Sequence, residues 1–427
     1  MKLLADLPRN ARYCIIFEPM WAVFNGMIFF YTPLYMKNLG ISEIEMGIVN
    51  TAALFSAFFF FFIAAPITNK LGRKKTTLIF DLIAWGPPML LWAFARSFWY
   101  FLAAGVVNTA VRVVFVSWNC LISEDTEADK RSKVYGIINV IGVISGIFTP
   151  VTGLFIAKYG TVATMRVLFV IGFASYVSMF FLRNALVTET RAGRVLIDKH
   201  SGFSLIQGLK SYVATLSYVF KNRYNILLSL IYIITNFISS LNFFQVIYLK
   251  EQLKFSEIFI SLAPAVNTVV YILLYVLVIP VLGRFRECKV LGVSFSICTL
   301  GALLFLFIPE KGFLVFLVAI CILSVGNMLS LTYRDTAFMN NLGEHEKADA
   351  FSGIQTLTTF ICIPSGYLAG YIYEINPKYP FIAIFTLFIC AVVISMLMFN
   401  KGNALQNTSA AHTDSQKQME GNVSIKA

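Results

Sequence analysis

The second half of the sequence repeats features of the first half. Three segments of the first half return in altered form: residues 35–44 (YMKNLGISEI) as 248–258 (YLKEQLKFSEI), Val49-Asn50-Thr51 as Val266-Asn267-Thr268, and Gly136 with Gly153 as Gly353 with Gly370. Long apolar stretches separate these segments in both halves. The pattern predicts a duplicated bundle of membrane helices, in which a substrate path typically runs between the two halves.

The composition places the chain in a membrane. It is 58% hydrophobic and 13% charged, and its mean hydropathy is +0.74. The net charge of +12 would suggest nucleic-acid binding in a soluble protein. Here, however, most Lys and Arg residues fall in alternate loops, which predicts cytoplasmic N- and C-termini by the positive-inside rule and no nucleic-acid partner.

A span of about 20 residues crosses the hydrocarbon core. The apolar stretches give twelve predicted spans: 13–36, 44–66, 76–95, 98–121, 134–157, 165–182, 226–249, 259–281, 289–308, 313–335, 350–373 and 380–399. We therefore expect an all-α integral membrane protein made of two pseudo-symmetric six-helix bundles.

Four segments follow from these spans. We expect an N-terminal bundle at 1–182, a cytoplasmic central loop at 183–225, a C-terminal bundle at 226–400 and a disordered cytoplasmic tail at 401–427. Apolar residues at helical spacing in the central loop predict an amphipathic helix, either on the membrane surface or packed against the bundle: Leu205, Leu209, Val213, Leu216 and Phe220.

The residues required by several other functions are missing. The seven cysteines lack metal-ligand spacing, and the three histidines fall in predicted cytoplasmic segments. There is no phosphate-binding loop and no Gly-x-Ser-x-Gly motif. We therefore expect no metal site, no cofactor and no enzymatic activity.

Polar side chains concentrate in every third span, namely the first, fourth, seventh and tenth. Because a polar group in hydrocarbon needs a partner or water, we expect these spans to enclose a central cavity. The candidate substrate-binding residues are Trp21, Asn25, Asn108, Asn236, Asn242, Gln245 and Asn327. Each amide could instead join neighbouring helices.

Glu18 is the sharpest candidate for proton coupling. It lies in the first span near Trp21, where a carboxyl group could take up and release a proton near neutral pH. Arg112 is expected at a similar depth, so the two could form an ion pair that breaks during transport. The alternative is a permanent pair that only stabilises the bundle. Asp81 is expected to pair with Arg73 or Lys74 at the membrane surface, and the alternative is a buried proton site.

The segment Ala65-Pro-Ile-Thr-Asn69-Lys70-Leu-Gly72-Arg73-Lys74 resembles the Gly-x-x-x-Asp-Arg-x-Gly-Arg-Lys loop of the major facilitator superfamily (MFS). Asn69 replaces the acidic residue and could instead bond a helix N-terminus. An acidic stretch followed by Arg after the fourth span also resembles the family. The resemblance implies a gating loop made of Asn69, Lys70, Gly72, Arg73, Lys74, Glu124, Asp125 and Arg131.

The fifth span resembles the family's antiporter motif in part. It keeps Pro150 and Gly153, which we interpret as a hinge, but lacks three of the motif's glycines.

The resemblance implies a secondary active transporter that works by alternating access in the plasma membrane. We expect a functional monomer that carries a small organic solute and is driven by protons, with efflux of amphipathic compounds as one form. The alternatives are symport of a sugar or organic acid, and a sensor or scaffold that does not transport.

Overall fold

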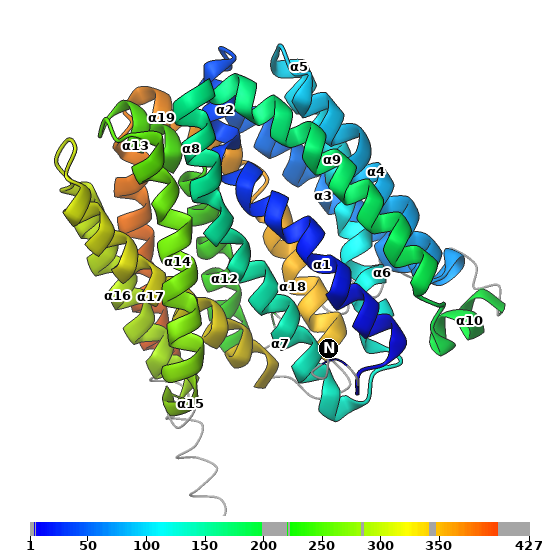
Figure 1. Ribbon diagram of the computed structural model, residues 1–427. Helices are drawn as coiled ribbons and strands as arrows, with labels where there is room; N and C mark the ends of the chain where they lie inside the picture. Colours follow the sequence, from blue (N-terminus) through cyan, green and yellow to red (C-terminus); the bar gives the residue numbers. More distant parts are fainter. Residues whose placement is uncertain are drawn as a thin grey trace, which may run out of the picture.

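The computed structural model describes residues 4, 6–198, 220, 223–282, 286–340 and 347–399, and these form a helical bundle (Figure 1). Within them, 11 helices are long and apolar enough to cross a membrane. The predicted eleventh span is a pair of shorter helices, so the arrangement agrees with twelve crossings. The predicted tail and the apolar residues at 205–216 lie outside the described residues.

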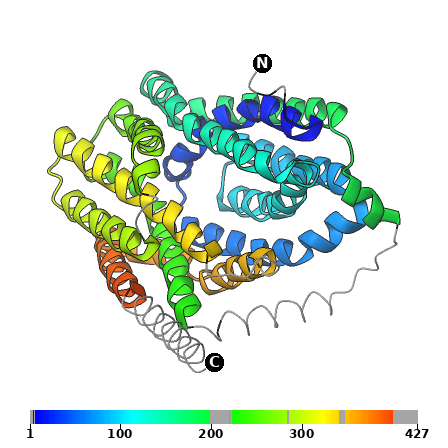
Figure 2. The same ribbon diagram turned by 90° about the horizontal axis from the view of Figure 1, so that it is seen from below.

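The first half contains the following elements: α1 Arg9–Ile28, η2 Phe29–Tyr31, α2 Thr32–Asn38, α3 Glu43–Leu71, α4 Arg73–Ala93, α5 Phe98–Asn108, α6 Val111–Ser123, α7 Ala128–Ile144, η3 Ser145–Phe148, α8 Thr149–Tyr159, α9 Thr161–Leu186 and α10 Arg191–Asp198. The second half contains α12 Arg223–Asn242, α13 Gln245–Glu251, α14 Glu257–Leu277, α15 Ile279–Leu282, α16 Glu287–Leu306, α17 Phe313–Asn340, α18 Lys347–Ile361, α19 Ser365–Ile375 and a last helix, Tyr379–Phe399. Figure 2 shows the two groups of helices side by side.

Several spans are interrupted along their length. The first and seventh break at η2 and between α12 and α13, and the fifth and eleventh break at η3 and at residues 362–364. The break in the eleventh ends at Pro364, which cannot donate a backbone hydrogen bond. These two pairs of spans break at corresponding places, whereas the fourth span breaks between α5 and α6 and its counterpart, the tenth, is the continuous helix α17.

The repeated segments fold alike. Ser42 and Ser256 cap the N-termini of α3 and α14 with their hydroxyl oxygens. In the first half Lys37 Nζ lies 2.5 Å from Glu43 Oε1, and in the second half Lys250 Nζ lies 2.5 Å from Glu257 Oε1. These segments lie at the face opposite the start of α1, which we call the opposite face; the face where α1 begins is the N-terminal face.

The halves meet along two matching seams, α3 against α19 and α8 against α14. A Cβ atom added at Gly370 would lie 2.3 Å from the Glu43 carbonyl oxygen. A Cβ atom added at Gly153 would lie 2.9 Å from the Glu257 carbonyl oxygen, the equivalent position. Only glycine permits such close backbone contact, so the two seams have the same construction.

Candidate functional site

The first half encloses a pocket of about 190 Å³ between α1, α4, α6 and α9, which we call the charged pocket. Glu18 and Trp21 from α1 line it together with Trp118 from α6. Trp85 of α4 stands edge-on to Trp21, with ring centroids 5.9 Å apart. Aromatic rings thus surround a carboxyl group at membrane depth.

An ion pair forms one wall of the charged pocket. Asp81 of α4 accepts a hydrogen bond from Arg183 of α9, and both side chains are buried. The expected pairing of Asp81 with Arg73 or Lys74 is therefore wrong. Arg183 was assigned to the central loop, but α9 continues to Leu186 and holds it inside the bundle.

Glu18 makes no hydrogen bond or ion pair with any described residue, and the expected pair with Arg112 is not formed. Arg112 instead lies with its guanidinium carbon 5.1 Å from the centre of the Phe61 ring, and its Nε has no hydrogen-bond partner among the described residues. Asp81 and Arg183 are paired with each other, so Glu18 is the carboxyl group of the pocket that has no charged partner among the described residues.

The second half encloses a different cavity, of about 120 Å³, which we call the amide pocket. Four amide side chains line it: Asn242, Gln245, Asn267 and Asn327. Three of them were predicted as substrate-binding residues. Asn267 was missed, although the repeated Val-Asn-Thr segment marked it. Five of the predicted site residues thus line two pockets, one within each half: Glu18 and Trp21 line the charged pocket, and Asn242, Gln245 and Asn327 line the amide pocket.

The remaining predicted amides are engaged elsewhere or lie apart from these pockets. Asn108 donates its amide to the Ala84 carbonyl oxygen at 2.9 Å, and so joins α5 to α4. Asn236 donates to the Tyr232 carbonyl oxygen of its own helix at 2.8 Å. Asn25 is partly buried in α1 and is not among the lining residues of either pocket.

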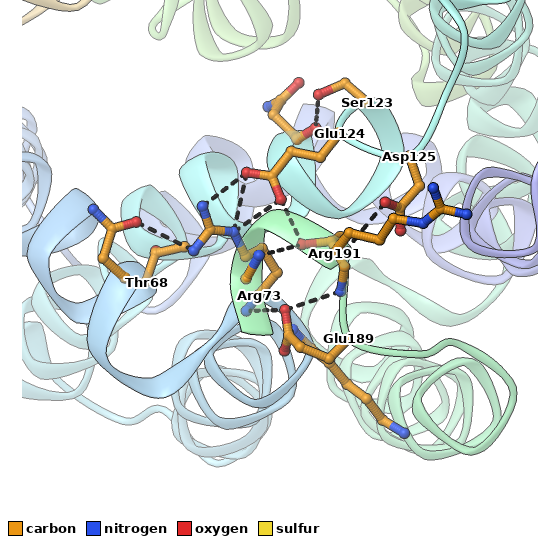
Figure 3. A network of polar contacts seen from close by, with 12 residues as sticks. Thr68, Arg73, Ser123, Glu124, Asp125, Glu189 and Arg191 are labelled. Atoms are coloured by element: carbon orange, nitrogen blue, oxygen red, sulfur yellow. Dashed lines mark hydrogen bonds and ion pairs between the residues drawn. The ribbon is translucent and has the colours of Figure 1, made fainter. Parts of the chain in front are cut away.

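The predicted gating loop forms a polar network at the N-terminal face (Figure 3). The Arg73 side chain donates to both carboxylate oxygens of Glu124, with Nη2 to Oε1 at 2.8 Å. Asn69 accepts from Arg73 Nη1 at 3.2 Å, and the bond that it could make to a helix N-terminus is not formed among the described residues.

Glu189 supplies the carboxylate that the loop itself lacks. Its two oxygens accept from the backbone N–H groups of Arg73 and Lys74, at 2.9 and 3.0 Å, where they cap the positive end of the α4 dipole. Gly72 adopts φ 84° and leaves room for this carboxylate. Sequence reasoning missed Glu189 because it lies far along the chain, in the predicted central loop.

The other members of the loop have simpler surroundings. Asp125 accepts from the Arg191 backbone N–H at 3.3 Å, and Arg131 donates from Nε to the Thr126 carbonyl oxygen at 3.1 Å. The Lys70 side chain is exposed.

The predicted hinge lies directly after η3. Pro150 occupies the first turn of α8, and Gly153 lies in the seam with α14. The interruption before α8 and the close backbone contact after it are both compatible with a hinge, whose motion stays a prediction.

The chain matches the family model of the Major Facilitator Superfamily over residues 20–244 and 228–421. It is 22% identical to Multidrug resistance protein 2 of Bacillus subtilis (strain 168), over 88% of this chain and 92% of that protein. It is 26% identical to Multidrug resistance protein MdtG of Yersinia enterocolitica serotype O:8 / biotype 1B (strain NCTC 13174 / 8081), over 44% of this chain but only 45% of that protein.

Solved structures show the same fold. The nucleoside transporter NupG superposes with a TM-score of 0.69 at 14% identity, covering 92% of this chain and 99% of that chain. The POT family transporter PepTSo superposes with a TM-score of 0.70 at 12% identity, covering 94% and 99%. With the apolar membrane helices and the matched residues together, this chain is a multi-pass membrane transporter that belongs to the Major Facilitator Superfamily.

Proposed function

We propose that the chain exports amphipathic organic compounds across the plasma membrane in exchange for protons, with Glu18 as the proton carrier. The observation that carries the proposal is the unpaired carboxyl group in the charged pocket. Asp81 and Arg183 compensate each other, so a change of protonation at Glu18 changes the net charge of the pocket. Such a group can exchange a proton without breaking a neighbouring ion pair.

The lining of the charged pocket supports an amphipathic substrate. Trp21, Trp85 and Trp118 offer large apolar faces with polar N–H edges. Two relatives support export as the direction of transport, because both are named multidrug resistance proteins.

The same mechanism requires the two halves to move against each other. We infer that the glycine seams close the opposite face, and that the Arg73 network holds the N-terminal face of the first half together. The distribution of Lys and Arg supports a cytoplasmic N-terminal face. Alternating access would then open one face as the other closes.

A flux measurement tests this function. Purified protein is placed in liposomes loaded with ethidium, and efflux is followed with and without a pH gradient, for wild type, Glu18→Gln and Glu310→Gln. Glu310 lies in an exposed loop, where its carboxylate accepts from Lys254 Nζ at 2.8 Å, so its variant is the matched control.

We expect wild type and Glu310→Gln to accelerate efflux when a proton gradient is applied, whereas Glu18→Gln does not respond to the gradient. An equal response in Glu18→Gln would remove the proton role of Glu18. Uptake of a sugar or organic acid driven by the gradient would favour symport, and the lack of any flux would favour a sensor or scaffold.

A further inference from the structure

The amide pocket lies wholly within the second half and collects its polar groups from separate elements. Asn242 ends α12 and Gln245 begins α13, so both lie at the interruption of the seventh span. Asn267 lies near the middle of α14 and Asn327 near the middle of α17. The pocket is therefore at membrane depth.

Contacts within the protein satisfy little of the hydrogen-bonding capacity of these amides. Asn267 is in contact with the Ser324 hydroxyl, and Asn327 Oδ1 lies 3.7 Å from Cys298 Sγ. A side-chain amide can make about four hydrogen bonds, two as donor and two as acceptor. Because unsatisfied amides at this depth are costly, the pocket is suited to a polar occupant.

The walls limit the size of that occupant. Gly326 lets α17 approach α16 so closely that an added Cβ would lie 2.8 Å from the Ser294 carbonyl oxygen. The rings of Phe305, Phe381 and Phe388 also line the pocket, together with the smaller apolar side chains of Ala302, Ile320, Leu323 and Ile384. A volume of about 120 Å³ has room for one small group and not for a whole drug-sized molecule.

The chemistry of the lining defines the occupant further. All of the lining residues of the amide pocket are uncharged, so an ionic group would be buried there without a counter-charge. Amides both donate and accept, so a group that does both uses them most fully.

We propose that the amide pocket is a subsite for an uncharged group that both donates and accepts hydrogen bonds, such as a carboxamide. This proposal rests on the proposed function, because it assigns the uncharged group to a transported solute. The charged pocket and the amide pocket would then recognise different parts of one substrate.

Binding of a fragment tests the proposal without a proton gradient. Saturation-transfer NMR is recorded on the full chain in lipid nanodiscs, with acetamide, acetone, acetate and ethylammonium as probes of similar size. We expect acetamide to bind about tenfold better than acetone, which accepts but does not donate, and acetate and ethylammonium not to bind.

Two variants locate the signal. Asn327→Leu removes one amide, and Ala302→Leu fills the pocket without changing an amide, so acetamide binding should be lost in both. Asn119→Leu is the matched control, because the Asn119 amide donates to the Phe115 carbonyl of its own helix at 2.6 Å. It should bind acetamide as wild type does.

Three outcomes would overturn the proposal: no acetamide binding to wild type, equal binding of all four probes, or acetamide binding that survives in both Asn327→Leu and Ala302→Leu. Thermal unfolding of each variant shows whether it is folded. The flux of ethidium is measured separately. If acetamide does not bind, the proposed function still stands; if the flux test fails, acetamide binding still shows whether the amide pocket is a subsite.

Discussion

Asn108 and Asn327 lie in corresponding spans, the fourth and the tenth, yet their side chains make different contacts. Asn108 donates to the Ala84 carbonyl and joins two helices, whereas Asn327 lines a cavity and its side chain makes only a distant sulfur contact among the described residues. The charged pocket of the first half contains Glu18, Asp81 and Arg183, and the amide pocket has an uncharged lining. Duplication thus preserved the scaffold, including both glycine seams, while the two pockets diverged in chemistry.

The largest effect expected from a single substitution lies in the charged pocket. Arg183→Gln leaves Asp81 buried without its partner, which should destabilise the protein by about 3–5 kcal/mol. The double variant Asp81→Asn/Arg183→Gln should recover much of that loss. Thermal unfolding in one detergent measures both, with exposed Arg96→Gln as the control. Equal midpoints for Arg183→Gln and Arg96→Gln would show that the ion pair is unimportant.

The seams should respond alike in the two halves. Gly153→Leu and Gly370→Leu each place a side chain against backbone of the other half, at a cost of about 1–3 kcal/mol or more. We expect both to abolish ethidium efflux to a similar extent. Gly142→Leu is the control, because nothing lies within 4 Å of its added Cβ. Loss of efflux in only one of the two seam variants would show that the two seams are not equivalent.

The N-terminal face should depend on Glu189. Glu189→Gln weakens the interaction with the N-terminus of α4, at a cost of about 1 kcal/mol. We expect a modest fall in the unfolding midpoint and slower efflux, since the helix that carries Arg73 loses its anchor. An unchanged midpoint with an unchanged efflux rate would show that the Arg73–Glu124 contact is sufficient alone.

The smallest expected effect is a difference in stability between variants of Asn108 and Asn327. Asn108→Leu leaves the Ala84 carbonyl without its donor, which should cost about 1 kcal/mol. Asn327→Leu replaces a poorly satisfied amide with an apolar group and should leave the unfolding midpoint nearly unchanged. If Asn327→Leu destabilised the protein more than Asn108→Leu, then Asn327 would be the structural amide and the contrast would be reversed.

The fold could be predicted well because it depends on hydrophobic length and on repetition, which are both written along the chain. The pairing of charges could not. Arg183 lies three residues before the end of α9, and a predicted span that stopped at 182 moved it out of the bundle. A small error at a helix end therefore assigned Asp81 to the wrong partner.

The candidate sites were predicted in part for a similar reason. Glu18 and Trp21 line one pocket, and three predicted amides line the other, since polar residues in apolar spans are easy to recognise. Which helix each side chain faces depends on helix rotation and on breaks such as the one between α12 and α13. Glu189 lies outside any span, so no intramembrane signal marked it.

The most direct test of the central claim is an infrared difference measurement of carboxyl protonation in the purified protein as pH is raised. Wild type should show the loss of a protonated carboxyl band that is missing in Glu18→Gln and retained in Asp81→Asn. A band that persists in Glu18→Gln and disappears in Asp81→Asn would contradict the account, because the titrating proton would then belong to the ion pair and not to Glu18.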